Sequence, residues 1–202
     1  LADVEVIVHA AALASFSFKP EVFDVNVDQT STFVRAVREL PKLRRFVHVG
    51  TAMICGRTSH RLVQEDDFPD DKARQMVLYT KSKAEIERRL PALLGDVPLV
   101  IARPSIVVGH TEVGCAASPS IYWLFRMMHA ARLVPCPTGN RIDVIPVDWC
   151  GQALAFLALK PELAHQRYHV SAGEPSARSF EQIDDALAHA HGEAPAEPLR
   201  TF

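Results

Sequence analysis

The chain has 202 residues, of which 48% are hydrophobic and 23% charged, the balance of an ordinary globular protein long enough to bury a core. Its formal net charge is −2 with both signs mixed, so composition provides no reason to expect nucleic acid or an anionic membrane surface as a partner. Apolar runs stay shorter than the roughly 18 residues that a membrane span needs. The four cysteines are scattered without a C-x-x-C pair, which favours reduced thiols in a cytoplasmic protein.

The first half of the chain alternates between two patterns. Short β-branched runs typical of buried strands lie at 4–10, 44–52 and 98–109. Between them, apolar residues recur at helical spacing over 20–40 and 78–94, so two amphipathic helices are predicted. This alternation indicates right-handed crossovers and a parallel sheet.

The second half mixes helices with short strands. The predicted helices lie at 121–134, 149–159 and 179–192, and the predicted strands at 141–148 and 167–173. Ser179 and Gln182 are spaced as a capping box, and Gly192 is placed to end the last helix. We expect the tail after it, 193–202, to be frayed.

The stretch "YTKSK" places Tyr79 and Lys83 at positions i and i+4, on the same face of the second predicted helix. A free phenol titrates near pH 10 and is a poor acid or base at neutral pH. A neighbouring ammonium favours the phenolate and is expected to lower the pKa of the phenol. Such a pair can exchange a proton with a carbonyl or alcohol oxygen.

Thr51 supplies a hydroxyl at the carboxyl end of the second predicted strand, where open parallel sheets bind their ligands. A long polar loop, 57–75, returns the chain to Tyr79 at the start of the next helix. We therefore expect Thr51, Tyr79 and Lys83 to meet at one edge of the sheet. The alternative is that Tyr79 and Lys83 form an exposed helical pair worth tenths of a kcal/mol.

Six segments, taken in order, resemble the extended short-chain dehydrogenase/reductase family, over about Val4 to His191. They are "VIVHAAA", "NVDQT" (family N-V-x-G-T, with Gln29 replacing the glycine), "FVHVGTAMICG", "YTKSKAEIE" (family Y-x-x-S-K-x-x-x-E), "RPSIVVG" and "DVIPVDWCGQAL". Within the family, "VHVGTA" and "DVIPVD" are most similar to the fatty-acyl-CoA and thioester reductase branch, although Gly50 replaces the serine usual there.

The resemblance implies an α/β fold: a Rossmann-like, doubly wound parallel sheet with a small substrate lobe. Residues 1–112 would be the remainder of the dinucleotide-binding domain. Residues 113–202 would be a mixed substrate lobe with a returning strand–helix unit of the sheet.

The resemblance also implies roles for individual residues. Tyr79 would be the general acid/base, Lys83 would lower its pKa and bind the nicotinamide ribose, and Thr51 would hydrogen-bond the substrate oxygen. Asn26 would lie in the proton-relay region, or would be a simple helix-face amide. The residues expected along the cofactor cleft are Ala10, Ala11, Asn26, Val49, Tyr79, Lys83, Pro104, Ser105 and Ile106. For Ala10, Ala11, Pro104 and Ile106, plain core packing is the alternative.

The activity implied is reduction of an acyl thioester or carbonyl compound with NADP or NAD, NADP being preferred. A sugar-nucleotide epimerase or dehydratase is the alternative, and a non-catalytic nucleotide sensor or scaffold is the third. A homodimer is an expectation from the family alone.

The glycine-rich turn expected of this family is missing from the sequence pattern. The nine glycines do not form the G-x-x-G-x-x-G turn that holds a dinucleotide pyrophosphate. We therefore expect this chain to be a fragment that lacks a first section of about 70 residues.

The nine histidines show no metal-site spacing, and His189 and His191, at i and i+2, are expected on different sides of a helix, so no metal ion is predicted.

Overall fold

The structure is a computed structural model that describes residues 1–15, 18–56, 62–69, 73–75, 77–114, 121–193 and 197–201. Its contacts divide the chain into two compact units. The first comprises Leu1–Ser105 and Trp149–Val170, and the second Ile106–Asp148 and Ser171–Phe202. Within the described ranges, no helix is both long enough and apolar enough to cross a bilayer.

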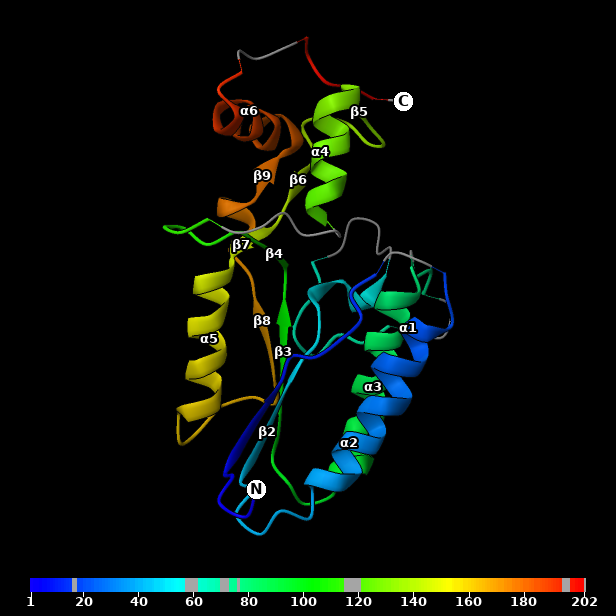
Figure 1. The fold of residues 1–202 in the computed structure, drawn as a ribbon, viewed down its shortest axis with the longest axis vertical. Coiled ribbons are helices and arrows are strands. Elements are labelled where there is room, and N and C mark those ends of the chain that lie inside the picture. The colour runs from blue at the N-terminus through cyan, green and yellow to red at the C-terminus, as the bar shows by residue number, and fades with distance from the viewer. Residues whose placement is uncertain are drawn as a thin grey trace. The chain divides into compact units, whose positions relative to one another are not determined.

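The first unit is built around a parallel sheet. Its elements are β1 (Val6–His9), α1 (Glu21–Phe23), the π-helix η1 (Asp24–Gln29), α2 (Thr30–Val37), β2 (Arg45–Val49), the 3₁₀ helix η2 (Ala52–Cys55), α3 (Leu78–Leu94), β3 (Leu99–Pro104), most of α5 (Val147–Leu159) and β8 (Arg167–Val170). The described strands lie in the order β1-β2-β3-β8 and are all parallel. Helices α1, α2 and α3 cover one face and α5 the other (Figure 1). The predicted α/β class and parallel sheet are confirmed.

Apolar residues at helical spacing form the core between the sheet and its helices. Val27, Val34 and Val37 from the η1–α2 segment pack with Ile86 and Leu90 from α3. Phe46, Leu99 and Ile101 from the strands complete this cluster. The predicted helix 78–94 is confirmed as α3, with the same bounds.

The predicted helix 20–40 contains a widened turn. Asp24–Gln29 is π-helical, and the Thr30 hydroxyl donates to the carbonyl of Val25 five residues earlier, at 3.3 Å. Single π turns of this kind occur often at functional sites. Here the turn carries Asn26, which is buried.

Arg45 attaches α5 to the sheet. Its buried guanidinium donates to four carbonyl oxygens at the carboxyl end of that helix, those of Leu157, Ala158, Lys160 and Pro161, at 2.6–3.1 Å. A cation at this end also meets the negative pole of the helix dipole.

Two predicted strands proved to be divided. The strand expected at 98–109 is β3 and β4 (Ile106–Val108), which belong to different sheets. Pro104 has no N–H to continue the β3 ladder, which ends at its pairing with Val170. The strand expected at 141–148 is β6 (Arg141–Ile142) and β7 (Val144–Pro146), separated by Asp143. The Asp143 carboxylate instead accepts from the backbone N–H groups of Ala172 and Gly173, at 3.1 and 2.9 Å.

The second unit consists of short strands and two helices. Its elements are β4, α4 (Ile121–Ala131), β5 (Leu133–Val134), β6, β7, the 3₁₀ helix η3 (Glu174–Ser176), β9 (Arg178–Ser179), α6 (Phe180–His191) and β10 (Arg200–Thr201). The capping box of Ser179 and Gln182 is confirmed, and Gly192 ends α6 in the left-handed conformation.

Two boundaries in this unit were predicted wrongly. The helix expected at 121–134 ends at Ala131, because Arg132 has φ of 56° and the next two residues form β5. The tail expected to be frayed contains β10, which pairs in parallel with β5.

Candidate functional site

Lys83 reaches from α3 to the carboxyl end of β2. Its Nζ donates to the carbonyl oxygen of Val49 at 2.8 Å, and the side chain is buried. Thr51 follows two residues later, is also buried, and caps η2 by accepting a 3.3 Å hydrogen bond from Met53 N. Lys83 and Thr51 therefore lie at the same end of one strand.

The packing of η2 against α3 holds this arrangement in place. Ile54 and Cys55 of η2 form a buried cluster with Ala84, the residue after Lys83. The Gln75 amide donates to the carbonyl of Ile54 at 2.5 Å, just before α3 begins. These contacts fix the start of α3, which carries Tyr79, beside the segment that follows β2.

Tyr79 is half-buried in the first turn of α3. Burial raises the pKa of its phenol above the ordinary value. This differs from the expectation that Lys83 lowers the Tyr79 pKa. The hydrogen bond that the Lys83 ammonium makes goes to the Val49 carbonyl, and the loss of hydration dominates at the phenol.

The pKa of the Lys83 ammonium is shifted toward neutral pH at this edge of the sheet. Burial lowers its pKa from 10.5 to about 8, and the negative charge of Glu87 one turn later partly offsets that change. The ammonium is therefore the main form at pH 7, but its proton is much more easily lost than that of an exposed lysine.

Asn26 links three segments near Tyr79. Its Oδ1 accepts from Leu13 N at 2.7 Å, and its Nδ2 donates to Leu13 O at 3.2 Å and to Ser82 Oγ at 3.0 Å. The Ser82 hydroxyl in turn donates to the Tyr79 carbonyl at 2.7 Å. The Asn26 amide thus joins the loop after β1 to the first turn of α3. Ser82, which stands in the quoted "YTKSK" motif, was not assigned this role from the sequence.

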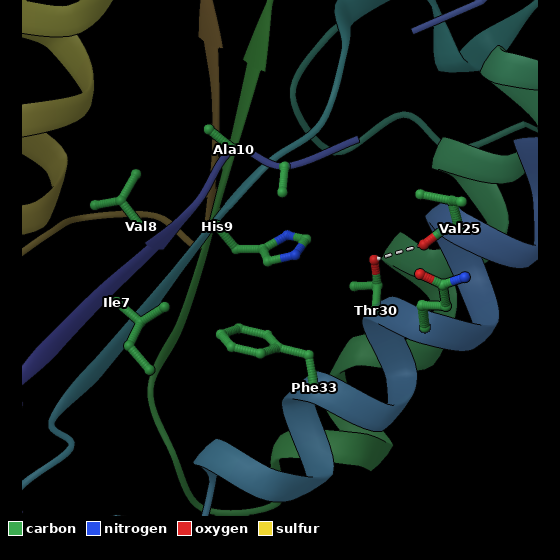
Figure 2. A pocket seen from close by; sticks show the side chains of 9 residues that line it. Ile7, Val8, His9, Ala10, Val25, Thr30 and Phe33 are labelled. Carbon is green, nitrogen blue, oxygen red and sulfur yellow. Dashed lines mark hydrogen bonds between the residues drawn. The ribbon is translucent and has the colours of Figure 1, made fainter. Parts of the chain in front are cut away.

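A cavity of about 430 Å³ lies between β1 and the η1–α2 segment (Figure 2). Ala10 and Ala11 contribute small side chains to its lining, and the rings of His9 and Phe33, which also line it, pack against each other with centroids 5.4 Å apart. His9 also stacks on the buried His48 of β2 at 5.7 Å. Burial and the nearby Lys83 charge lower the pKa of both imidazoles, which keeps them neutral.

The remaining cofactor residues expected from the sequence lie where the chain leaves the sheet. Pro104 ends β3, and Ser105 N donates to the carbonyl of Val170 at 3.0 Å. The buried Ser105 Oγ has no hydrogen-bond partner within the described protein. Ile106 begins β4, which belongs to the second unit. The register pairs Val49 with Ala102 and His9 with His48, so Ala10, Val49 and Ser105 follow the same edge of the sheet.

These features fit a nicotinamide dinucleotide. Small side chains leave room beside β1, a buried hydroxyl is unpaired at the end of β3, and a buried cation lies between them at the end of β2. Buried polar atoms are rarely left unpaired, so the free Ser105 Oγ is consistent with a ligand contact.

A buried ion pair below this edge was missed from the sequence. The Arg103 guanidinium of β3 forms hydrogen bonds with both carboxylate oxygens of Glu87 in α3, and both side chains are fully buried. Arg103 also donates to the carbonyls of Glu65 and Asp67, each at 2.9 Å, and so holds the segment that leads to Tyr79. Motif spacing does not reveal such a pair, because its two members come from different elements.

The chain resembles a curated protein of Drosophila melanogaster. It is 26% identical over 181 residues to CG8303 of Drosophila melanogaster, which is assigned as a fatty acyl-CoA reductase; the match covers 72% of this chain and 33% of that protein. The chain therefore spans about a third of the length of this curated relative.

Solved structures share the fold. The terminal R domain of the myxalamid PKS-NRPS pathway superposes with a TM-score of 0.75 at 20% identity, over 98% of this chain and 48% of that one. The UDP-glucuronic acid 4-epimerase of Bacillus cereus, in complex with NAD, gives a TM-score of 0.73 at 20% identity, over 98% and 63%. At these identities, the likeness establishes a Rossmann-type fold.

Sequence comparison with protein families identifies the group to which the chain belongs. The profile of the male sterility protein family, an NAD-binding family, matches residues 1–154, which include β1, Thr51, Tyr79, Lys83 and the end of β3. This agrees with the extended short-chain dehydrogenase/reductase character expected from the motifs. The chain is therefore a member of the male sterility protein family, an NAD-binding family.

Proposed function

We propose that the protein containing this chain reduces an acyl thioester or a related carbonyl compound, with Tyr79 as the general acid. The observation that carries the proposal is the 2.8 Å contact between Lys83 Nζ and Val49 O. This contact brings the helix of Tyr79 to the strand end that is followed by Thr51. The family match and the similarity to CG8303 favour a reductase over other activities of the same fold.

The raised pKa of Tyr79 suits this direction of reaction. A reduction consumes a proton at the substrate oxygen, so the acid must carry its proton at neutral pH. A bound reduced nicotinamide supplies the hydride. Tyr79 donates its phenolic proton to the oxygen of the carbonyl, while the Thr51 hydroxyl holds that oxygen and stabilises the charge that develops there. For a thioester, the resulting hemithioacetal separates into an aldehyde and a free thiol.

Lys83 and Asn26 hold Tyr79 in position through contacts of its helix. Lys83, through its hydrogen bond to the Val49 carbonyl, holds the helix of Tyr79 at this strand end. Asn26, through Ser82, fixes the backbone turn that carries Tyr79. Ala10, Ala11, Val49, Pro104, Ser105 and Ile106 would surround the dinucleotide. Three expectations for the protein stay predictions: a preference for NADP over NAD, a cytoplasmic location and homodimer formation.

The decisive assay follows NADPH and NADH consumption at pH 7 by the purified protein with three substrates: a long-chain acyl-CoA, a simple aldehyde and a UDP-sugar. Net oxidation of the nicotinamide with release of free thiol from the acyl-CoA supports the proposal. Conversion of the UDP-sugar without net oxidation would instead support the epimerase alternative. Turnover of none of the three, together with nucleotide binding, would support the non-catalytic alternative.

A further inference from the structure

A cluster of metal-ligand side chains lies in the second unit, where α4 packs against α6. His129 comes from α4, His191 is the last residue of α6, and Glu193 follows it. One donor atom from each lies within 4.8 Å of the others. His129 Nε2 is 3.2 Å from one Glu193 oxygen, and His191 Nδ1 is 3.9 Å from the other.

The His129 ring is fixed from behind by a carboxylate. Its Nδ1 lies 2.7 Å from Asp184 Oδ1, and Asp184 is buried and held by two hydrogen bonds from Arg132, at 2.8 and 2.7 Å. Histidines that bind metals almost always donate their second ring N–H to a carboxylate or carbonyl in this way. This contact assigns the Nδ1 proton to the side of Asp184 and leaves Nε2 directed at Glu193.

The end of α6 places the other two side chains. Gly192 adopts the left-handed conformation, with φ of 69° and ψ of 23°, which residues with a Cβ rarely adopt. Glu193 N then donates back to the Ala188 carbonyl at 2.9 Å. This turn brings the Glu193 carboxylate back toward His191 and His129, because the chain reverses immediately after the helix.

We propose that His129, His191 and Glu193 form a binding site for a divalent transition-metal ion, with Zn²⁺ as the best match. Two imidazole nitrogens and one carboxylate are ligands that Zn²⁺ binds in proteins, with water in the fourth position. Ligand atoms around a tetrahedral Zn²⁺ lie roughly 3.3 Å apart. His129 Nε2 is 3.2 Å from one Glu193 oxygen, whereas His191 Nδ1 is 3.9 Å from the other oxygen and has to move closer. Small rotations of the exposed His191 and Glu193 side chains would complete the site.

The charges and the location indicate what the ion would do. Asp184 and Glu193 contribute two negative charges and Arg132 one positive charge, so the site favours a cation over an anion. A bound ion would connect α4 with the end of α6, two helices that the chain separates widely: His129 and Glu193 are 64 residues apart. Spacing rules do not detect such a site, which explains why no metal ion was predicted from the sequence.

The test is a titration of the purified protein with Zn²⁺ in competition with a chromophoric chelator, repeated with His191→Ala and His189→Ala. His189 lies on the same helix but outside the cluster, so it is the matched control. We expect the His191→Ala variant to bind Zn²⁺ at this site at least tenfold more weakly, and His189→Ala to bind as the wild type does. Glu193→Gln, a change at an exposed side chain, should weaken binding as well.

Thermal unfolding gives a second readout that does not depend on activity. Zn²⁺ should raise the melting temperature of the wild type and of His189→Ala, and should raise it less in His191→Ala and Glu193→Gln. Co²⁺ at the same site should give the absorption bands of tetrahedral nitrogen and oxygen coordination. Equal Zn²⁺ affinity in the wild type and His191→Ala, or no Zn²⁺ binding by the wild type at micromolar concentration, would show that the cluster is only a hydrogen-bonded contact and would overturn the proposal.

Discussion

Lys83 is a buried cation whose hydrogen-bond acceptor is the neutral carbonyl of Val49, 2.8 Å from Nζ at the end of β2. Burying an ammonium costs free energy, and a carbonyl repays less of that cost than a carboxylate would. The lowered pKa of Lys83, about 8, reflects the same cost. The Lys83 ammonium therefore lowers the stability of the fold, although it has a role in the proposed reaction.

Lys83→Met should stabilise the fold while abolishing turnover. The folded-state pKa lies below the unfolded value of 10.5, so below pH 8 both states are protonated and the whole cost of burial is present. From pH 8 to 10.5 the unfolded chain binds more protons, so the wild type gains stability as the pH rises. We expect the variant to gain about 1–2 kcal/mol at pH 7, where the Val49 carbonyl loses its donor, and this advantage should shrink above pH 8.

Urea unfolding at pH 7 and at pH 9.5 measures both effects. Lys81→Met is the matched control, since Lys81 is exposed on the same helix. It should change stability by less than about 0.5 kcal/mol at either pH. A wild type more stable than Lys83→Met at pH 7 would contradict the account of Lys83 as a buried charge that its surroundings compensate only in part.

Tyr79→Phe removes the proposed proton donor while keeping the ring. General acid catalysis contributes roughly 10²–10⁴-fold to a rate, so kcat for thioester or carbonyl reduction should fall by that factor. Nucleotide binding should change little. Tyr122→Phe, in α4, is the control and should retain full kcat. Steady-state kinetics with intact circular dichroism spectra separate loss of chemistry from loss of fold, and full turnover by Tyr79→Phe would refute the acid/base assignment.

The sequence contained the local part of this site. The helical spacing of Tyr79, Lys83, Ile86 and Leu90 was enough to predict α3, because helical periodicity acts over a few residues. The expectation that Tyr79 and Lys83 lie near the end of β2 came from Thr51, which follows that strand, and from the loop that returns the chain to Tyr79. The contact to Val49 could not be read in the same way, since it depends on how α3 packs against the sheet. The Tyr79 pKa was expected to be lowered and is raised, because burial depends on the packed fold and not on local spacing.

The breaks in the predicted strands have a similar origin. Apolar, β-branched residues lie on both sides of Pro104 and Ser105, so the pattern indicates one strand. The partner changes at that point from β8 to β7, and this exchange is set by distant segments. Asp143 interrupts its strand because its carboxylate binds Ala172 and Gly173, a contact that periodicity cannot predict.

Asn26→Ala should release the loop after β1. The Asn26 side chain accepts from Leu13 N and donates to Leu13 O and Ser82 Oγ, so its removal leaves the Leu13 backbone groups and the buried Ser82 hydroxyl without this partner. We expect a loss of about 2 kcal/mol in unfolding free energy and faster hydrogen exchange at the Leu13 amide. Asn26→Asp keeps an acceptor for Leu13 N but loses both donors, so it should protect that amide while still lowering stability.

Hydrogen exchange followed by NMR or mass spectrometry reports on Leu13 directly. Gln29→Ala is the control on the same helical segment, where the exposed Gln29 side chain donates only to Asp24, at 2.9 Å, among the described contacts. It should leave the exchange at Leu13 unchanged. Unaltered protection of Leu13 in Asn26→Ala would mean that the amide does not hold the loop.

Arg103→Met should be the most destabilising change considered, because it removes one partner of a fully buried pair. Glu87 would keep a buried carboxylate, with only Arg167 at 3.5 Å among the described cations, and the carbonyls of Glu65 and Asp67 would lose their donor. Breaking a buried ion pair in this way costs about 3–5 kcal/mol. Faster proteolysis within 62–69 should accompany the loss. The double variant Arg103→Met with Glu87→Leu should recover part of the stability, since no buried carboxylate is then left without its guanidinium, while Arg167 and Lys83 lose the nearby Glu87 charge.

The pair of Arg89 and Glu85 on the exposed side of α3 provides the comparison. Its atoms approach to 2.7 Å, but both side chains reach solvent, so Arg89→Gln should cost less than about 1 kcal/mol. Denaturant unfolding of the wild type, Arg103→Met, the double variant and Arg89→Gln shows whether burial or contact geometry determines the loss of stability. If Arg103→Met costs no more than Arg89→Gln, or if the double variant is no more stable than Arg103→Met alone, the buried pair is not what holds the segment before Tyr79 to the sheet.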